Sequence, residues 1–395
     1  MSLLKILVIG SGGREHAIAW RLALEGHEIF CAPGNPGTAQ IATNLPDHLA
    51  IEADLTVVGP EGPLVAGVVD QFRARGLAIV GPTQEAARLE GSKIHSKEFM
   101  RKVGIPTARF VRIENDGLAA LDQFDYPVVV KADGLAAGKG VIIAHTRKEA
   151  EAAVISLGPL LVIEEFLEGE EVSFIVLCDG RNVVPLEPTQ DHKAVGDGDT
   201  GPNTGGMGAY CDGRILSHGN IGQILDTVIE PAVRATGFTG FLYAGMMMTA
   251  AGPKVLEFNV RLGDPEAQVL MHRLDDDFAG TLMRAAQGDL KASSLKWKSE
   301  PSVCVVLAAA GYPGQVRTGD SITLGESLAQ VFHAGTRIGL RGLETSGGRV
   351  LGVTAAGIDL ASAMGNAYAG VDKIQFEGMH YRRDIGKKGL KRWDG

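Results

Sequence analysis

Three side chains with the chemistry of a phosphoryl-transfer site alternate along one predicted strand. The strand covers residues 254–261, and its period of two places Glu257, Asn259 and Arg261 on one face and apolar residues on the other. Carboxylate and amide oxygens are hard ligands that suit Mg²⁺ held together with substrate phosphates. A guanidinium suits an anionic group in transfer. A solvated strand face carrying an ion pair would produce the same pattern, so the segment needs support from others.

Two lysines flank a glycine-rich loop that precedes this strand. Lys93 stands at the start of a helix predicted over 92–103, and Lys131 ends a predicted strand. Lysine binds phosphate as a point charge, although either residue alone would be an ordinary surface lysine. The loop, residues 132–140, is one residue short of a P-loop, lacks its Ser or Thr, and leads into a strand rather than a helix. It therefore predicts a hairpin flap that closes over phosphates.

Three further segments offer binding groups. Residues 161–171 run from a strand into an acidic turn, which can hold an adenine with main-chain groups and a ribose with a carboxylate, or can be an acidic surface turn. Residues 185–209 form a long loop of Gly, Pro and polar residues, a composition that favours function over a linker. Residues 10–15 resemble a dinucleotide-binding turn, but Glu15 replaces the third glycine. A tight turn whose amides hold an anion is the better interpretation.

The elements that must position these groups follow from the apolar pattern. In the first 90 residues or so, short apolar strands each end in a Gly or Pro turn and are followed by helices, which predicts a parallel doubly wound sheet with ligands at the strand ends. Two strands joined by the flap predict a local antiparallel sheet, so the second region is α+β. The expected strands are 5–9, 28–31, 55–58, 77–80, 127–130, 141–144, 241–248, 254–260, 303–308 and 350–354, and the later helices 219–235, 265–288 and 360–371.

Composition excludes several classes of protein. The chain has 395 residues, 53 of them glycine without a Gly-X-Y period, and 45% hydrophobic residues, so it is neither collagen-like nor disordered. A net charge of −9 disfavours nucleic acid and anionic membranes as partners. The four cysteines form no CxxC pair and the longest apolar runs are too short for a membrane span, so we expect a cytoplasmic protein with reduced thiols.

Taken in order, these pieces resemble the ATP-grasp superfamily. The matching series is Lys93, Lys131, the flap, the acidic segment from Glu164 to Glu171, and Glu257 with Asn259. Additional motifs are similar to those of the members that join glycine to 5-phosphoribosylamine, and the resemblance covers essentially the whole chain. Those motifs are residues 58–61, 131–140, 190–209, 240–245, 263–266, 348–351 and 383–386.

The resemblance implies a multidomain α/β and α+β fold. It has an N-terminal doubly wound (pre-ATP-grasp) substrate domain, residues 1–92, and a small C-terminal α/β domain, residues 301–395. Between them lies the ATP-grasp region, residues 93–300, with a mobile lid at about 107–184 and a central part at about 185–300. ATP would lie between the lid and the central part.

The resemblance also implies the reaction, in which ATP, glycine and 5-phosphoribosylamine give ADP, phosphate and glycinamide ribonucleotide through glycyl phosphate, an early step of purine synthesis. ATP is the co-substrate, Mg²⁺ or Mn²⁺ the metal, and the protein a monomer or weak homodimer. Arg261 and Lys131 would be catalytic, and Glu257 and Asn259 would hold the metal. ATP would contact Lys93, Lys131, Gly138, Lys139, Gly140, Glu164, Glu165, Phe166, Leu167 and Glu171. Glycine and the amine would contact Gly12, Gly13, Arg14, Glu15, Asp191, Lys193, Asn203, Thr204, Gly205, Gly206 and Asp264, with the division between the two left open.

The chain departs from the family pattern at a few positions. Ala194 follows Lys193 where the family usually has Arg, so one cation near the substrates is missing. Val260 and Leu262 replace the usual Cys and Phe, which should affect packing only, and no third acidic metal ligand is evident on strand 241–248. Two alternatives remain: another ATP-grasp carboxylate–amine ligase or carboxylase with a different acid, and a nucleotide-binding regulatory module without turnover.

Overall fold

The computed structural model describes residues 3–115, 117–135, 140–291 and 294–393. Its first unit is a five-stranded parallel sheet in the order β3-β2-β1-β4-β5. The predicted doubly wound domain is thus confirmed, although the last strand is shorter than expected. Its strands are β1 Lys5–Gly10, β2 Glu28–Pro33, β3 Thr43–Asn44, β4 Leu55–Val58 and β5 Ile79–Val80, and its helices α1 Gly13–Leu24, η1 Thr38–Gln40, α2 Glu61–Val65, α3 Val68–Ala74 and α4 Gln84–Gly91.

A second, smaller sheet carries the flap. Its four strands lie in the order β6-β9-β7-β8, all antiparallel, and the strands on either side of the flap pair with each other as expected. The helix α6 packs on it over a separate apolar core, which lets this unit fold around its own interior. The elements are α5 Lys93–Val103, β6 Phe110–Ile113, η2 Ala119–Gln123, β7 Val128–Ala132, β8 Val141–Ala144, α6 Arg147–Leu157 and β9 Leu161–Glu165.

A nine-stranded antiparallel sheet forms the middle of the molecule. Its order is β17-β16-β10-β12-β15-β18-β23-β20, with β11 paired to β10. Its strands are β10 Glu170–Asp179, β11 Val183–Pro185, β12 Thr189–Asp191, β15 Gly208–Cys211, β16 Thr239–Thr249, β17 Gly252–Asn259, β18 Ser302–Ala308, β20 Gln330–His333 and β23 Arg349–Ala356. The smaller pieces are β13 Ala194–Gly196, η3 Asp197–Asp199, β14 Thr200–Asn203, β19 Thr323–Leu324, β21 Thr336–Gly339, β22 Gly342–Thr345, β24 Ile374–Gln375 and η5 Lys387–Arg392.

The pairings of this sheet cross two of the expected domain boundaries. The strand β10 pairs along its length with β16, so the small sheet ends at Glu165, and the strand that completes the expected lid, up to about residue 184, lies in the central sheet. The strands after residue 301 continue the same sheet through β18, so the C-terminal unit shares its sheet with the central part. Both differences arise from pairings between strands far apart in the chain.

One of the two helices expected in the central region is present, and the other is divided. Residues 218–236 form one continuous helix, as expected over 219–235, made of α7 His218–Ile224, the π-turn η4 Leu225–Ile229 and α8 Glu230–Thr236. The pattern over 265–288 is two helices, α9 Glu266–Arg273 and α10 Phe278–Gln287, so the expectation of one helix is wrong. Leu274 is extended, and the Asp277 carboxylate accepts a hydrogen bond from the Gly280 amide at 2.9 Å, which starts a new helix. The C-terminal helix α11, Leu360–Val371, has the predicted bounds.

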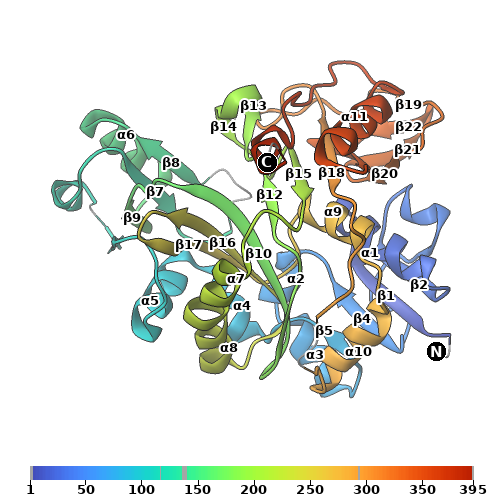
Figure 1. Cartoon of the computed structure of the whole chain (residues 1–395), viewed down its shortest axis with the longest axis horizontal. Coiled ribbons are helices and arrows are strands. Elements are labelled where there is room, and N and C mark those ends of the chain that lie inside the picture. The colour runs from blue at the N-terminus through green and yellow to red at the C-terminus, as the bar shows by residue number, and fades with distance from the viewer. Residues whose placement is uncertain (1–2, 116, 136–139, 292–293, 394–395) are drawn as a thin grey trace.

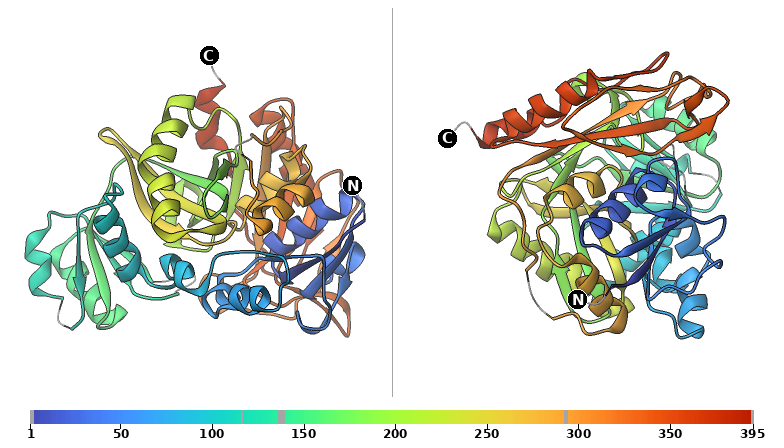
Figure 2. Two further views of the ribbon diagram at one scale, coloured as in Figure 1. Left: turned by 90° about the horizontal axis from the view of Figure 1, so that it is seen from below. Right: turned by 90° about the vertical axis from the view of Figure 1, so that its right-hand side faces the viewer.

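The three sheets meet around one central region. Figure 1 shows the small sheet with α6 at one end of the molecule and the N-terminal sheet at the other, with β17, β16 and β10 between them. Figure 2 shows the same separation from below, with α5 at the lid side of the central strands. The segment 185–209, expected to be a loop, contributes β12 and β15 to the large sheet and the hairpin β13–β14 beside it. Of the helices that the structure describes, none has both the length and the apolar character to cross a membrane.

Candidate active site

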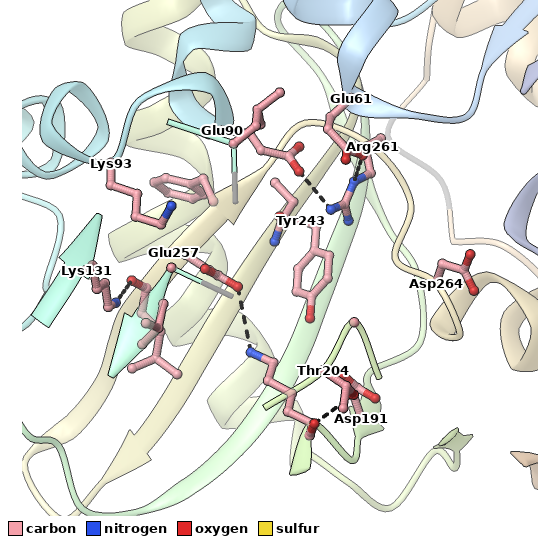
Figure 3. A pocket seen from close by; sticks show the side chains of 18 of the residues that line it. Glu61, Glu90, Lys93, Lys131, Asp191, Thr204, Tyr243, Glu257, Arg261 and Asp264 are labelled. Carbon is pink, nitrogen blue, oxygen red and sulfur yellow. Dashed lines mark hydrogen bonds and ion pairs between the residues drawn. The ribbon is translucent and has the colours of Figure 1, made fainter. Parts of the chain in front are cut away.

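A cavity of about 520 Å³ opens where the lid, the central sheet, the N-terminal domain and the C-terminal unit meet. It is lined by side chains that are far apart in the sequence, and it includes many of those predicted from the sequence. Predicted residues in its lining are Arg14, Lys93, Lys131, Gly140, Asp191, Lys193, Thr204, Gly205, Glu257, Asn259, Arg261 and Asp264. Figure 3 shows Lys93 and Lys131 on one side of Glu257, with Arg261, Asp191 and Asp264 on the other.

The strand β17 presents the predicted carboxylate and amide to the cavity. A bulge interrupts its pairing with β16, where Gly245 faces Glu257 and Met246 faces Val255. The residue between them, Leu256, lines the cavity together with Glu257, although strict alternation placed it on the opposite face. A bulge of this kind re-aims side chains locally, so both surfaces of the strand contribute to the site at this point.

Glu257 is an ionised carboxylate among cations. Burial alone would raise its pKa, but Lys193, Lys131, Lys93 and Arg261 outweigh burial and lower the pKa of Glu257 to about 2. The Lys193 Nζ lies 3.7 Å from its Oε1. Among the residues that the structure describes, no three His, Cys, Asp or Glu side chains gather as a metal cage. Glu257 and Asn259 therefore fit a cation that takes its remaining ligands from substrate phosphates, as Mg²⁺ typically does.

Arg261 follows β17 directly and is held by two carboxylates of the N-terminal part. Its Nη2 lies 2.7 Å from Glu90 Oε1, and its Nε 3.2 Å from Glu61 Oε2. The Val260 amide donates to the other oxygen of Glu90 at 2.7 Å. Both acids raise the pKa of Arg261 against the opposing effect of burial, so its charge is permanent. The pair of acids fixes the guanidinium at the rim between the two domains.

The two predicted phosphate-binding lysines lie on the lid side. Lys93 donates to the Gly134 carbonyl at 2.8 Å, at the root of the flap. Burial lowers its pKa, and Glu257 opposes that change. Lys131 donates to the Leu256 carbonyl at 3.1 Å and forms an ion pair with Glu164. Gly138 and Lys139, expected to contact ATP, lie outside the described residues.

The acidic segment, residues 161–171, does not line the cavity, and its Glu164 lies behind Lys131. The Glu164 side chain is 2% exposed and forms ion pairs with Lys97 and Lys131. Glu165 accepts hydrogen bonds from the Arg109 amide at 2.9 Å and from Lys254. Phe166 is exposed, Leu167 is buried, and Glu171 forms an ion pair with Lys193. The carboxylate of Glu164 is thus already engaged, and the Glu165 amide donates to the Arg109 carbonyl at 3.0 Å.

The segment 185–209 brings Asp191, Lys193, Thr204 and Gly205 to the cavity, whereas Asn203 is exposed on β14. Its geometry requires glycine at position 206. Gly206 has φ +111°, and a Cβ there would stand 2.7 Å from an Asp191 carboxylate oxygen and 2.6 Å from the Pro265 ring. The path of the loop past Asp191 therefore depends on the absence of a side chain.

The C-terminal unit closes this side of the cavity. Arg349 donates to the Gly205 carbonyl at 2.6 Å and to the Asp264 carbonyl, and its Nη2 lies 3.4 Å from an Asp264 carboxylate oxygen. The Tyr312 hydroxyl accepts a hydrogen bond from the Gly205 amide at 3.0 Å. Ala194, the departure from the family pattern, is buried, and its carbonyl accepts from Arg382 at 3.1 Å.

The turn of residues 10–15 in the N-terminal domain lies beside Asp264 at the cavity. A Cβ on Gly12 or Gly13 would stand 3.5 Å from an Asp264 carboxylate oxygen, so the turn and Asp264 lie against each other. Arg14 lines the cavity and donates to the Leu262 carbonyl at 3.0 Å. Glu15 is buried beneath the turn, where its carboxylate binds the Arg14 Nε at 2.6 Å. Glu15 therefore holds Arg14 instead of lining the cavity.

Several lining residues had no predicted role. These are Glu61, Glu90, Lys97, Tyr243, Glu266, Tyr312 and Arg349. Four of them belong to motifs that carried the family resemblance, which was a usable signal. Lys97 stands one helical turn after Lys93 on α5, so the helical period could have found it. Glu90 sits at the end of an ordinary amphipathic helix, and no local signal distinguishes it.

Comparison with known proteins agrees with the geometry. The family models for phosphoribosylglycinamide synthetase match as an N domain over residues 4–90, an ATP-grasp (A) domain over 91–267 and a C domain over 302–388. Phosphoribosylamine–glycine ligase of Pseudomonas aeruginosa is 48% identical over 99% of this chain and 100% of its own length, and that of Yersinia pestis 47% over 98% and 100%. The crystal structure of the Thermotoga maritima enzyme is 36% identical, covering 96% of this chain and 100% of its own, with a TM-score of 0.86. A biotin carboxylase from Campylobacter jejuni, 14% identical over 98% of this chain and 95% of its own, shares the fold with a TM-score of 0.73.

Proposed function

The chain belongs to the phosphoribosylglycinamide synthetase family, and we propose that its cavity joins glycine to 5-phosphoribosylamine with ATP, by the residues named below. The reaction yields ADP, phosphate and glycinamide ribonucleotide in purine biosynthesis. The observation that carries the assignment of the site is a single one. One cavity gathers Lys93 and Lys131 from the lid side, Glu257 with Arg261 from the centre, and the segment 185–209.

The chemistry follows from the weak electrophilicity of a carboxylate. A glycine carboxylate oxygen attacks the γ-phosphorus of ATP, the bond to the β-phosphate oxygen breaks, and ADP leaves. The amine of 5-phosphoribosylamine then attacks the carbonyl of glycyl phosphate, phosphate leaves, and the nitrogen loses a proton. Lys93 and Lys131 neutralise the ATP phosphates, and Arg261 stabilises the charge of the phosphoryl group in transfer. Because glycyl phosphate hydrolyses readily, a flap that excludes water protects it.

The family uses a divalent metal ion, and Glu257 with Asn259 would hold it as Mg²⁺ or Mn²⁺. When bound there, the ion supplies positive charge to the phosphate oxygens. The low pKa of Glu257 supports this assignment, since the carboxylate needs no deprotonation at neutral pH. Lys193 is a protein cation beside this carboxylate, with its Nζ 3.7 Å from the Glu257 Oε1.

We assign the remaining contacts by position. Main-chain groups of residues 165–167 face the adenine, and Glu171 faces the ribose, while the Glu164 side chain serves the lysines behind. Glycine and the amine occupy the side of the cavity bounded by Arg14, Asp264 and the segment 191–206. We keep the division into residues 1–92, 93–300 and 301–395, a monomer or weak homodimer, and a cytoplasmic location in which the four buried cysteines stay as free thiols.

The test is ADP release with ATP, Mg²⁺ and 5-phosphoribosylamine, measured with and without glycine. Omitting glycine should abolish turnover, and Glu257→Gln should lower it strongly, whereas Glu85→Gln on the exposed face of α4 should leave it unchanged. Equal turnover with an unrelated amino acid would favour an ATP-grasp ligase for another acid. Unchanged ATP turnover in Glu257→Gln would contradict the assigned site, and ATP binding without any ADP release would favour a regulatory module.

A further inference from the structure

Lys97 is a buried lysine at the junction of lid and central sheet, outside the expected set of ATP contacts. It lies on α5 one turn after Lys93, is 2% exposed, and forms an ion pair with Glu164. Its Nζ also donates to the Thr107 hydroxyl at 2.7 Å, which in turn donates to the Val255 carbonyl at 2.7 Å. A buried ammonium ion is costly unless it is paired, so its place requires an explanation.

The partner of Lys97 is shared with a residue assigned to ATP. One oxygen of Glu164 faces Lys97, and the other faces Lys131. Lys131 reaches the cavity and donates to the Leu256 carbonyl, beside the metal-binding carboxylate. The group thus connects α5, the lid strands β7 and β9, and the central strand β17.

The net charge of the group formed by Lys97, Glu164 and Lys131 decides how much positive charge Lys131 presents to a phosphate. One carboxylate between two ammonium groups leaves a net charge of +1 inside the wall of the cavity. With Lys97 removed, Glu164 and Lys131 would form a one-to-one pair with no net charge. Incoming phosphates would then have to compete with Glu164 for the Lys131 charge.

We propose that Lys97 is a positioning residue that acts through Glu164, taking up its negative charge so that the charge of Lys131 is available to the phosphates of ATP. The inference rests on the proposed function, because it assigns the cavity to ATP. Removing a unit charge a few ångströms behind the phosphates, in a partly buried setting, should weaken ATP binding by roughly ten- to hundred-fold.

The test measures ATP binding by calorimetry without the other substrates, so that it does not depend on turnover. Lys97→Met keeps the side-chain length and removes the charge, and it should bind ATP at least ten-fold more weakly while the Michaelis constant for glycine stays unchanged. The matched control is Lys102→Met, an exposed lysine on the same helix, which should bind ATP as the unaltered protein does.

A double variant separates charge from packing. In Lys97→Met/Glu164→Gln the group again carries +1, so ATP binding should recover relative to Lys97→Met. A double variant that binds no better than the single one would overturn the inference, as would unchanged binding in Lys97→Met. If Lys97→Met does not fold, Glu164→Gln alone decides. It should bind ATP at least as tightly as the unaltered protein, and weaker binding would contradict the charge argument.

The outcomes also separate this inference from the proposed function. If the unaltered protein binds no ATP, both fall together. If it binds ATP and releases ADP only with glycine while Lys97→Met binds ATP normally, the role of Lys97 alone is overturned. If ATP binding follows the charge of the group but turnover does not require glycine, the role of Lys97 stands and the substrate assignment falls.

Discussion

Replacing Glu90 by glutamine should slow phosphoryl transfer without weakening ATP binding. Glu90 is the nearer of the two acids that hold Arg261, at 2.7 Å, and it also accepts from the Val260 amide at 2.7 Å. Glutamine keeps the shape and one acceptor but removes the charge of the bond to Arg261. The guanidinium keeps its contact with Glu61 at 3.2 Å, so it is loosened rather than released.

The magnitude follows from the strength of such a bond. A charge-assisted hydrogen bond is about twice as strong as a neutral one, so the loss is about 1–2 kcal/mol of support for the position of Arg261. If Arg261 acts mainly on the phosphoryl group in transfer, that loss falls on the transition state and lowers kcat by about 5- to 30-fold.

The assay is steady-state ADP release with each substrate varied in turn, together with a thermal melt to verify folding. The expected result is a lower kcat with the Michaelis constant for ATP unchanged. The control is Glu85→Gln on the same helix, whose side chain is 75% exposed and pairs with Arg88 at 2.8 Å, and which should behave as the unaltered protein. A kcat within two-fold of the unaltered value, or an equal loss in ATP affinity and kcat, would refute the reasoning.

Three further predictions concern other parts of the structure. His16 accepts from the His333 amide at 2.8 Å, and burial, with His333 second, lowers the pKa of His16 to about 3. Below pH 6.5 the unfolded chain gains a proton there that the folded chain does not, so the free energy of unfolding should fall by about 2 kcal/mol between pH 7 and pH 5 from this residue. Urea unfolding of His16→Asn, which keeps an acceptor and does not titrate, should show a correspondingly smaller fall, and an equal fall would exclude His16 as its source. Arg349→Met should raise the Michaelis constants of glycine or the amine about ten-fold or more with ATP binding unchanged, because it frees the Gly205 and Asp264 carbonyls; a selective loss of ATP binding would contradict this. Gly206→Ala should lower kcat/KM for the same two substrates and leave the calorimetric ATP affinity intact, since the new Cβ meets the loop and not the ATP side; wild-type kinetics would show that the loop tolerates the shift.

Many of the residues that line the cavity were predicted from the sequence because local rules govern their placement. The period of a strand placed Glu257 and Asn259 together, and the structure brings both to one cavity. The Gly and Pro turns marked the ends of the parallel strands, and the four expected strands formed with bounds within two residues of the expectation. Whether a segment forms a strand or a helix depends largely on residues close to it in the chain, so the sequence predicts it directly.

What the sequence did not predict depends on long-range partners. The bulge that turns Leu256 into the cavity arises from the pairing of β17 with β16. The membership of β10 in the central sheet depends on β16, whose paired residues lie 60 to 78 positions later in the chain. Glu90 and Lys97 look like ordinary helix residues until the partners that fix their charges, Arg261 and Glu164, are placed beside them. Pairing of charges across domains is a property of the fold, and no local pattern encodes it.

The charge pairs also explain how a protein with a net charge of −9 can handle ATP. The cations of the cavity are few, and the chain fixes several of them with its own acids: Arg261 with Glu61 and Glu90, and Lys131 with Glu164. Each acid reduces the attraction for phosphate but holds its cation at a defined place, where it needs no further ordering when the substrate arrives. Lys97, which pairs with Glu164, offsets the reduced attraction for phosphate on the Lys131 side of the site. On the other side Arg261 pairs with two acids, Glu61 and Glu90, and Arg14 is a further cation that acts on both. Two acids thus hold Arg261, whereas Lys131 shares one acid with Lys97. That difference suits a division of labour in which the lysine side binds the phosphates of ATP and the arginine acts on the phosphoryl group only when charge develops there.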